Sequence, residues 1–177
     1  MKKDQKYYGK IVKFDEAEKY VESIILHFDT SNENQWLPLA GSLDNFLERL
    51  RRAKKNIPAC YQHDDEKLIG QWRDIVIENN MLKGRCYLDD IPFVREVVIP
   101  QLKSGTLQGS SPTISPVKEA YNRDKAIWEI IEGVLCEVSL VGLPADLRAD
   151  IIQMKASIDQ TTRKELEDNF NIELLTL

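Results

Sequence analysis

The sequence predicts an α+β domain whose mostly antiparallel β-sheet closes, or nearly closes, into a barrel of about seven strands with about three flanking helices. Segments rich in Val, Ile, Tyr and Phe follow one another along the chain with short polar turns between them, which favours antiparallel pairing. The regular alternation of strands and helices that builds a parallel sheet is missing. With 177 residues, the chain is long enough for one domain with a hydrophobic core.

Five strands are predicted in the first half of the chain. Residues 7–14 and 19–28 are apolar segments separated by charged turn residues. Residues 59–63 form a short predicted strand that ends at a histidine. Residues 72–77 and 82–88 then predict a hairpin around Glu-Asn-Asn, because asparagine favours tight turns.

Three helices are expected. The first begins at Ser42, a good N-cap residue, and ends near Lys55. Its apolar face has residues at helical spacing: Leu43, Phe46, Leu47 and Leu50. The second begins at Pro92 and should kink or end at Pro100. The third is expected over residues 143–155.

The second half of the chain adds two long strands, predicted over residues 111–121 and 126–141. The end of the second, Val134–Val141, is mostly apolar and suggests a central strand. We expect the folded domain to cover residues 1–155, and residues 156–177 to form a C-terminal tail or docking helix.

Composition narrows the classes of partner and compartment. The formal charge of −5 provides no broad basic surface, so no nucleic-acid partner is expected. The three cysteines, Cys60, Cys86 and Cys136, lack the spacing of a disulfide framework or a structural zinc site, so neither is expected. No metal and no cofactor is expected for this chain. No apolar run approaches the length of a membrane span and no signal peptide is evident, which favours a cytoplasmic protein away from membranes.

His63 is the first candidate for a chemical role. It follows an apolar strand in a polar, turn-forming stretch, which suits a residue at the rim of a sheet, although a structural role is the alternative. Asp64 and Asp65 are next to it in sequence, but neighbouring side chains point to opposite faces of a strand, so we expect them to be solvated. The other histidine, His27, lies near the end of an apolar strand.

A pair of serines and one carboxylate complete the candidates. Ser110 and Ser111 stand between Gly109 and Pro112, in either a polar loop or a rigid turn that presents a hydroxyl. Glu137 interrupts an apolar strand, where an unpaired buried charge is costly. It therefore either faces solvent or joins a polar cluster, in which it could hold an imidazole in its working tautomer.

Five motifs in this order resemble those of the prohead (capsid maturation) serine proteases of tailed phages, which are related to the herpesvirus assemblins. They are the Pro-Gly helix entry at Leu37–Leu43, the Tyr-x-His segment at Ile57–His63 with Ile69-Gly70 after it, the strand at Met81–Gly84, the Gly-x-Ser approach at Leu102–Ser111, and Glu-Val-Ser-Leu-Val-x-x-Pro-Ala at Glu137–Ala145. The last motif is the most specific, and together they cover most of the chain.

The resemblance implies an assemblin-like fold and a catalytic triad. Ser111 would be the nucleophile, His63 the general base, and Glu137 the carboxylate that orients His63. The chain departs from the family pattern directly after the serine, where many relatives have an apolar residue and a glycine and this chain has Pro112-Thr113. Ser110 therefore stays a second candidate for the nucleophile.

The implied function is a serine endopeptidase that cleaves scaffold protein and the N-terminal segment of the major capsid protein inside the immature capsid, in the host cytoplasm. A homodimer is a further implication, because assemblins pair. A catalytically inactive, protease-like assembly protein is an alternative that the Pro112-Thr113 departure favours. A small β-barrel binding domain with accidental motifs is another.

Overall fold

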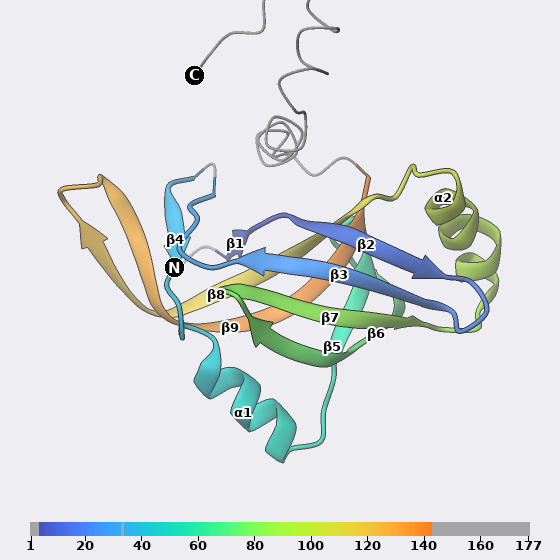
Figure 1. Ribbon diagram of the computed structural model, residues 1–177, viewed down its shortest axis with the longest axis horizontal. Helices are drawn as coiled ribbons and strands as arrows, with labels where there is room; N and C mark the ends of the chain where they lie inside the picture. Colours follow the sequence, from blue (N-terminus) through green and yellow to red (C-terminus); the bar gives the residue numbers. More distant parts are fainter. Residues whose placement is uncertain (1–3, 33, 143–177) are drawn as a thin grey trace, which may run out of the picture. The chain divides into compact units, whose positions relative to one another are not determined.

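The computed structural model describes residues 4–32 and 34–142 (Figure 1). Within these ranges the elements are β1 (Gln5–Lys6), β2 (Gly9–Asp15), β3 (Tyr20–His27), β4 (Trp36–Pro38), α1 (Asp44–Arg52), β5 (Ile57–Tyr61), β6 (Asp64–Glu78), β7 (Met81–Leu88), the π-helical segment η1 (Val94–Val98), α2 (Ile99–Lys103), β8 (Gly109–Asn122) and β9 (Ile127–Val141). The predicted helix over 143–155, the predicted tail over 156–177 and the boundary between them lie outside the described residues.

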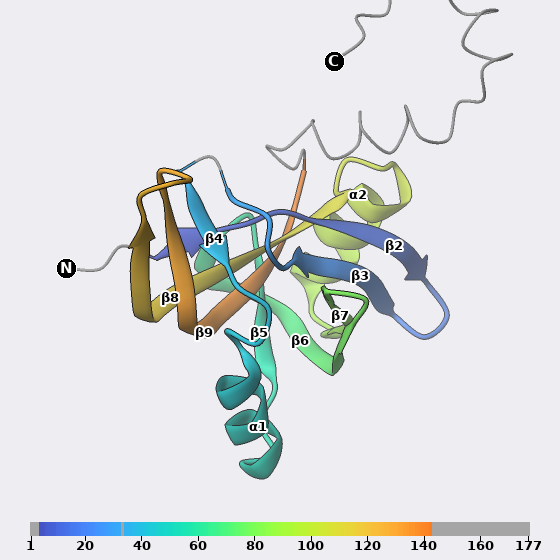
Figure 2. The same cartoon turned by 60° about the vertical axis from the view of Figure 1, so that its left-hand side comes forward.

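Seven strands close into a barrel in the order β8-β2-β3-β7-β6-β5-β9, and β9 pairs back with β8. Two shorter strands extend it, because β1 pairs with β8 and β4 pairs with β9 (Figure 2). The barrel prediction is thereby confirmed. The sheet is mixed, however, since β4 and β5 both run parallel to β9. The sequence prediction missed this because it did not recognise β4, from which the crossover through α1 returns the chain to β5 in the same direction.

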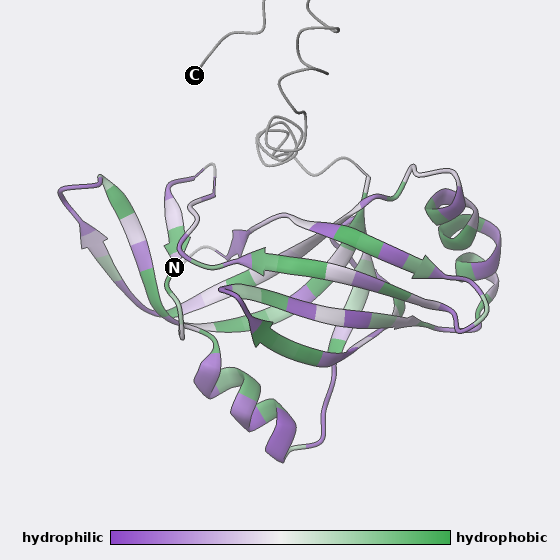
Figure 3. Cartoon of the chain, in the orientation of Figure 1, coloured by the Kyte–Doolittle hydropathy of each residue, from purple (hydrophilic) through white to green (hydrophobic). Residues whose placement is uncertain are grey.

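Apolar side chains fill the barrel, and Figure 3 shows hydrophobic segments gathered along its strands. The largest fully buried side chains are Trp72, Ile25, Leu26, Leu43, Ile57, Ile69, Leu82, Leu107, Ile114, Ile130, Leu140 and Val21. Most of them come from the six strands β3, β5, β6, β7, β8 and β9, so these strands share one core. Burial of this kind provides the main favourable term for folding and gives the strands rigid positions.

The tight turn between β6 and β7 follows the sequence prediction. Asn79 and Asn80 have φ angles of 51° and 61°, the left-handed values that a two-residue type I′ turn requires at both central positions. Asparagine tolerates this region better than most residues. The long hairpin of β8 and β9 is likewise confirmed, and its strands pair over most of their length.

Both helices differ from their predicted ends. The N-cap of α1 is Leu43 rather than Ser42, and no side chain caps it. Ser42 lies in the turn before the helix, where its amide binds the carbonyl oxygen of Leu39, and its side chain is buried. At the second helix, Pro100 does not end the helix. The chain passes from the π-helical η1 into α2, and Pro100 stands in the first turn of α2, where a missing N–H is best tolerated.

No helix among residues 4–32 and 34–142 combines the length and the hydropathy needed to cross a membrane.

Candidate active site

His63 lies in the two-residue turn between β5 and β6 rather than at the end of a strand. Tyr61 pairs with Asp64 across the turn, and Gln62 and His63 between them have φ angles of 55° and 60°. A left-handed conformation costs a residue with a side chain roughly 1–2 kcal/mol. The surrounding structure must therefore hold this turn in place.

Strand β9 provides that support through two hydrogen bonds. The backbone N–H of Gln62 donates to the carbonyl oxygen of Leu140 at 3.0 Å. The backbone N–H of His63 donates to the side-chain oxygen of Ser139, also at 3.0 Å. The turn that carries the imidazole is thus fixed to the same strand that carries Glu137.

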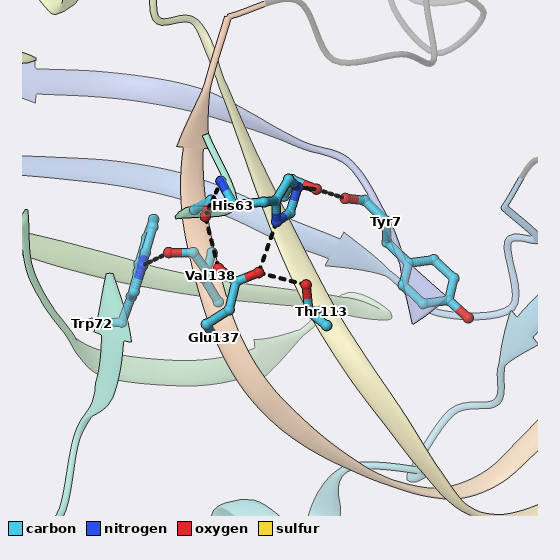
Figure 4. Close-up of polar contacts among 8 residues, drawn as sticks. Tyr7, His63, Trp72, Thr113, Glu137 and Val138 are labelled. Atoms are coloured by element: carbon cyan, nitrogen blue, oxygen red, sulfur yellow. Dashed lines mark hydrogen bonds and ion pairs between the residues drawn. The ribbon is translucent and has the colours of Figure 1, made fainter. Parts of the chain in front are cut away.

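Glu137 lies on β9 with three hydrogen-bond donors around its carboxylate. Oε1 accepts from Nδ1 of His63 at 2.8 Å and from the hydroxyl of Thr113, and Oε2 accepts from the hydroxyl of Ser139 at 2.8 Å. Figure 4 shows His63 and Thr113 reaching the same carboxylate oxygen. Burial raises the pKa of Glu137, but the hydrogen bonds from these three side chains outweigh it and hold the pKa below the ordinary value. Glu137 is therefore ionised at neutral pH.

Ser111 completes the arrangement from β8. Its Oγ lies 2.8 Å from Nε2 of His63, so the hydroxyl, the imidazole and the carboxylate form one chain of hydrogen bonds. Because an ionised Glu137 can only accept, Nδ1 of His63 carries the proton in the neutral ring. Nε2 then presents a lone pair to the Ser111 hydroxyl, which is the arrangement that general-base activation of a nucleophile requires.

The hydroxyl of Ser111 has a second acceptor, the carbonyl oxygen of Tyr7 at 2.6 Å. The strand pairs Lys6–Thr113 and Gly9–Ser110 share one register, which leaves Tyr7 opposite Pro112. The amide of Tyr7 donates to the carbonyl of Pro112 at 3.0 Å, but proline has no N–H to return the bond. The Ser111 hydroxyl occupies the place of that donor, and its side chain is fully buried.

The second-choice nucleophile, Ser110, points to the other face of β8. Its hydroxyl lies 2.7 Å from the hydroxyl of Ser23 and 3.3 Å from the carbonyl oxygen of Ile24, both on β3. The hydroxyl of Ser110 thus contacts the barrel wall, whereas that of Ser111 contacts His63 and Tyr7.

The remaining candidates lie outside this chain of contacts. His27 is exposed at the end of β3. Asp64 forms an ion pair with Lys67 at 2.6 Å, and this hydrogen bond lowers its pKa. Asp65 is exposed, so neither aspartate orients the imidazole among the contacts described.

Three residues of the site were not predicted from the sequence as members of it: Tyr7, Thr113 and Ser139. Strand alternation places Ser139 on the same face as Glu137, and it places Thr113 on the same face as Ser111, so this periodicity could have identified both. Tyr7 contributes its backbone carbonyl, for which side-chain identity carries no signal.

Comparison with known proteins identifies the family. The model of the caudovirus prohead serine proteases matches residues 9–164, and the chain belongs to this family. Among solved structures, the capsid assembly protease gp21 of bacteriophage T4 has a similar fold, with a TM-score of 0.63 and 13% sequence identity over 78% of this chain and 98% of that one. No individually curated protein matched the chain. The protein is therefore a prohead serine protease by family, with a fold shared by a phage capsid assembly protease.

Proposed function

We propose that this protein is a Ser-His-Glu endopeptidase that cleaves scaffold protein and the N-terminal segment of the major capsid protein inside the assembling phage prohead. Membership of the prohead protease family supports the reaction class and the location. The observation that carries the proposal is the pair of 2.8 Å contacts that link Ser111, His63 and Glu137. A homodimer, as in the assemblins, is part of the same proposal.

In the proposed reaction, Oγ of Ser111 attacks the carbonyl carbon of a peptide bond while Nε2 of His63 takes the hydroxyl proton. Glu137 holds Nδ1–H and stabilises the imidazolium that forms. His63 then gives the proton to the leaving amine, which leaves an acyl ester on Ser111. A water molecule, activated by the same imidazole, hydrolyses the ester and restores the serine.

The first test is Ser111→Ala in the full chain, co-expressed with the major capsid and scaffold proteins of the same phage and followed by gel electrophoresis. We expect both proteins to remain uncut. Ser42→Ala is the matched control, because it also removes a buried serine hydroxyl, one without a hydrogen-bond partner among the described residues. Processing that continues in Ser111→Ala but stops in Ser110→Ala would assign the nucleophile to Ser110, and processing in both would refute the proposal.

One observation favours the second candidate, an inactive protease-like assembly protein. The Ser111 side chain is fully buried and its hydroxyl is close to the Tyr7 carbonyl. A serine-directed fluorophosphonate separates the two functions, because covalent labelling requires an activated and reachable hydroxyl. Labelling that depends on both Ser111 and His63 would exclude the inactive protein. Failure of the wild-type chain to react would favour it.

A further inference from the structure

We infer that Ser139 is a positioning residue that fixes the turn carrying His63 against the carboxylate of Glu137. The inference rests on the proposed function, since it concerns the geometry of the same site. It assigns to Ser139 a role that acts through two other residues and involves no contact with substrate.

The hydroxyl of Ser139 makes two hydrogen bonds in which its donor and acceptor roles are both settled. It accepts the backbone N–H of His63 at 3.0 Å, since an amide can only donate. Its own proton goes to Oε2 of Glu137 at 2.8 Å, since the ionised carboxylate can only accept. One hydroxyl thus joins the backbone of the proposed base to the side chain of its proposed orienting group.

This connection matters because the turn at His63 is intrinsically unfavourable. Gln62 and His63 both adopt the left-handed conformation, in which glycine or asparagine would be preferred. Bound to Ser139, the backbone places Nδ1 of His63 2.8 Å from Glu137 and Nε2 2.8 Å from Ser111. Without that bond, the amide of His63 loses its acceptor. The backbone then no longer holds the imidazole in the one position from which it contacts both Glu137 and Ser111.

Burial strengthens the effect. Ser139 is fully buried, and His63 and Glu137 have side chains only 17% and 15% exposed. Water therefore has little access with which to replace a missing hydroxyl, and an unmade hydrogen bond in such a place is costly. Register adds a further constraint, because Ser139 on β9 pairs with Ser111 on β8. The connecting hydroxyl thus originates beside the nucleophile, on a rigid part of the barrel.

Thr113 offers a comparison within the same site. Its hydroxyl donates to Oε1 of Glu137, whereas the backbone N–H of His63 donates to Ser139. Thr113→Val removes a donor to the carboxylate at nearly constant shape. Ser139→Ala removes a donor to the carboxylate and also the acceptor of the His63 amide, so exchange of this amide is the quantity in which the two variants should differ.

The experiment measures two quantities on each full-length variant at a temperature where it is folded. The first is the rate constant for covalent labelling of Ser111 by an alkyl fluorophosphonate. The second is hydrogen exchange of the His63 backbone amide, measured by NMR, with the Gln62 amide as an internal reference because it binds Leu140 instead. The variants are Ser139→Ala, Ser139→Cys, Thr113→Val and the control Ser42→Ala.

We expect Ser139→Ala to label roughly 10- to 100-fold more slowly, the loss that a displacement of about 1 Å at a catalytic group produces. The His63 amide should exchange roughly 2- to 12-fold faster, corresponding to one lost hydrogen bond, while the Gln62 amide is unchanged. Ser139→Cys should behave alike, because a thiol fills the site but is a weak donor and acceptor. Thr113→Val should keep the His63 amide protected and label faster than Ser139→Ala.

Wild-type labelling rates and a protected His63 amide in both Ser139 variants would overturn the inference. So would equal changes at His63 and Gln62, since these would indicate general loosening. The proposed function would be refuted by a different result, namely equal labelling of the wild-type chain and the Ser111→Ala variant. The two failures are therefore distinguishable.

Discussion

Replacing Pro112 by alanine should make Ser111 more reactive. In the wild-type chain the carbonyl oxygen of Tyr7 lies opposite a proline and instead accepts the Ser111 hydroxyl at 2.6 Å. An alanine at position 112 has an N–H that can donate to this carbonyl, as in an ordinary antiparallel pair. The Ser111 proton is then left for Nε2 of His63 at 2.8 Å.

The size of the rate increase follows from the strength of the hydrogen bond between the Ser111 hydroxyl and the Tyr7 carbonyl, which the substitution removes. A neutral hydrogen bond contributes about 0.5–1.5 kcal/mol net. In the wild-type chain the Ser111 hydroxyl must break its hydrogen bond to Tyr7 before its proton moves to His63. A variant without this bond has an activation barrier lower by about 0.5–1.5 kcal/mol, which raises the labelling rate roughly 2- to 12-fold. Stability should change little. The flexibility gained by the unfolded chain costs about 0.4–1 kcal/mol, which the new backbone hydrogen bond offsets.

The assay is the rate constant for fluorophosphonate labelling of the full chain, with Pro116→Ala as the matched control. Pro116 is also a buried proline of β8, but it pairs with Gly133, four residues further along the strand. We expect Pro116→Ala to label at the wild-type rate. A folded Pro112→Ala variant that labels no faster than Pro116→Ala would refute the competition between Tyr7 and His63 for the hydroxyl proton.

Three further predictions concern stability. Glu137→Gln should lower the free energy of unfolding at neutral pH, and this loss should shrink as the pH falls below the ordinary pKa of 4.5, because the folded-state pKa is lower and its stabilisation is lost as the pH passes through it. Urea unfolding over a pH series tests this, and a loss independent of pH would contradict it. Trp72→Phe should cost about 1–3 kcal/mol in denaturant unfolding, because the buried ring no longer donates to the Val138 carbonyl at 2.9 Å; an unchanged midpoint would contradict this. Gly9→Ala should cost about 1–3 kcal/mol or more, because its Cβ would come closer than 3.0 Å to the carbonyl oxygen of Ile24. A melting temperature equal to that of the wild type would show that the strands can separate freely there.

Seven of the strands were predictable because local patterns determine them, whereas the short strands β1 and β4 were missed. Apolar residues and the Asn79-Asn80 turn indicated the hairpin of β6 and β7, and the long hairpin of β8 and β9 was equally clear. The parallel pairing of β5 with β9 was not predictable in this way, because it depends on the short strand β4 and the crossover through α1. Ser42 failed as a predicted cap because burial in the core took precedence over a local preference.

In the candidate site, too, the features set by local sequence were predictable and those set by long-range contacts were not. The motifs indicated Ser111, His63 and Glu137. The opposite facing of Ser110 and Ser111 was not predicted, because their segment was interpreted as a loop or a turn and not as a strand. Sequence placed His63 at the end of a strand, whereas it lies in a left-handed turn whose conformation is stabilised by β9. Such a contact joins residues 76 positions apart, and no local pattern reports it.

The role of Pro112 was hidden for a related reason. In the sequence it is a departure from the family pattern after the nucleophile. In the structure its missing N–H determines the second partner of the Ser111 hydroxyl, because Tyr7 comes to lie opposite it. The meaning of the substitution therefore depends on a strand pairing with the N-terminal segment.

The most direct test of the central claim is the fluorophosphonate labelling rate of His63→Ala, Glu137→Gln and the double variant, each compared with the wild type. If Ser111, His63 and Glu137 act as one unit, removal of the orienting carboxylate should slow labelling by up to about 10⁴-fold. The double variant should then be little slower than His63→Ala alone, because residues that act together are not additive. Labelling of Ser111 at the wild-type rate in His63→Ala, or effects that multiply in the double variant, would contradict the account.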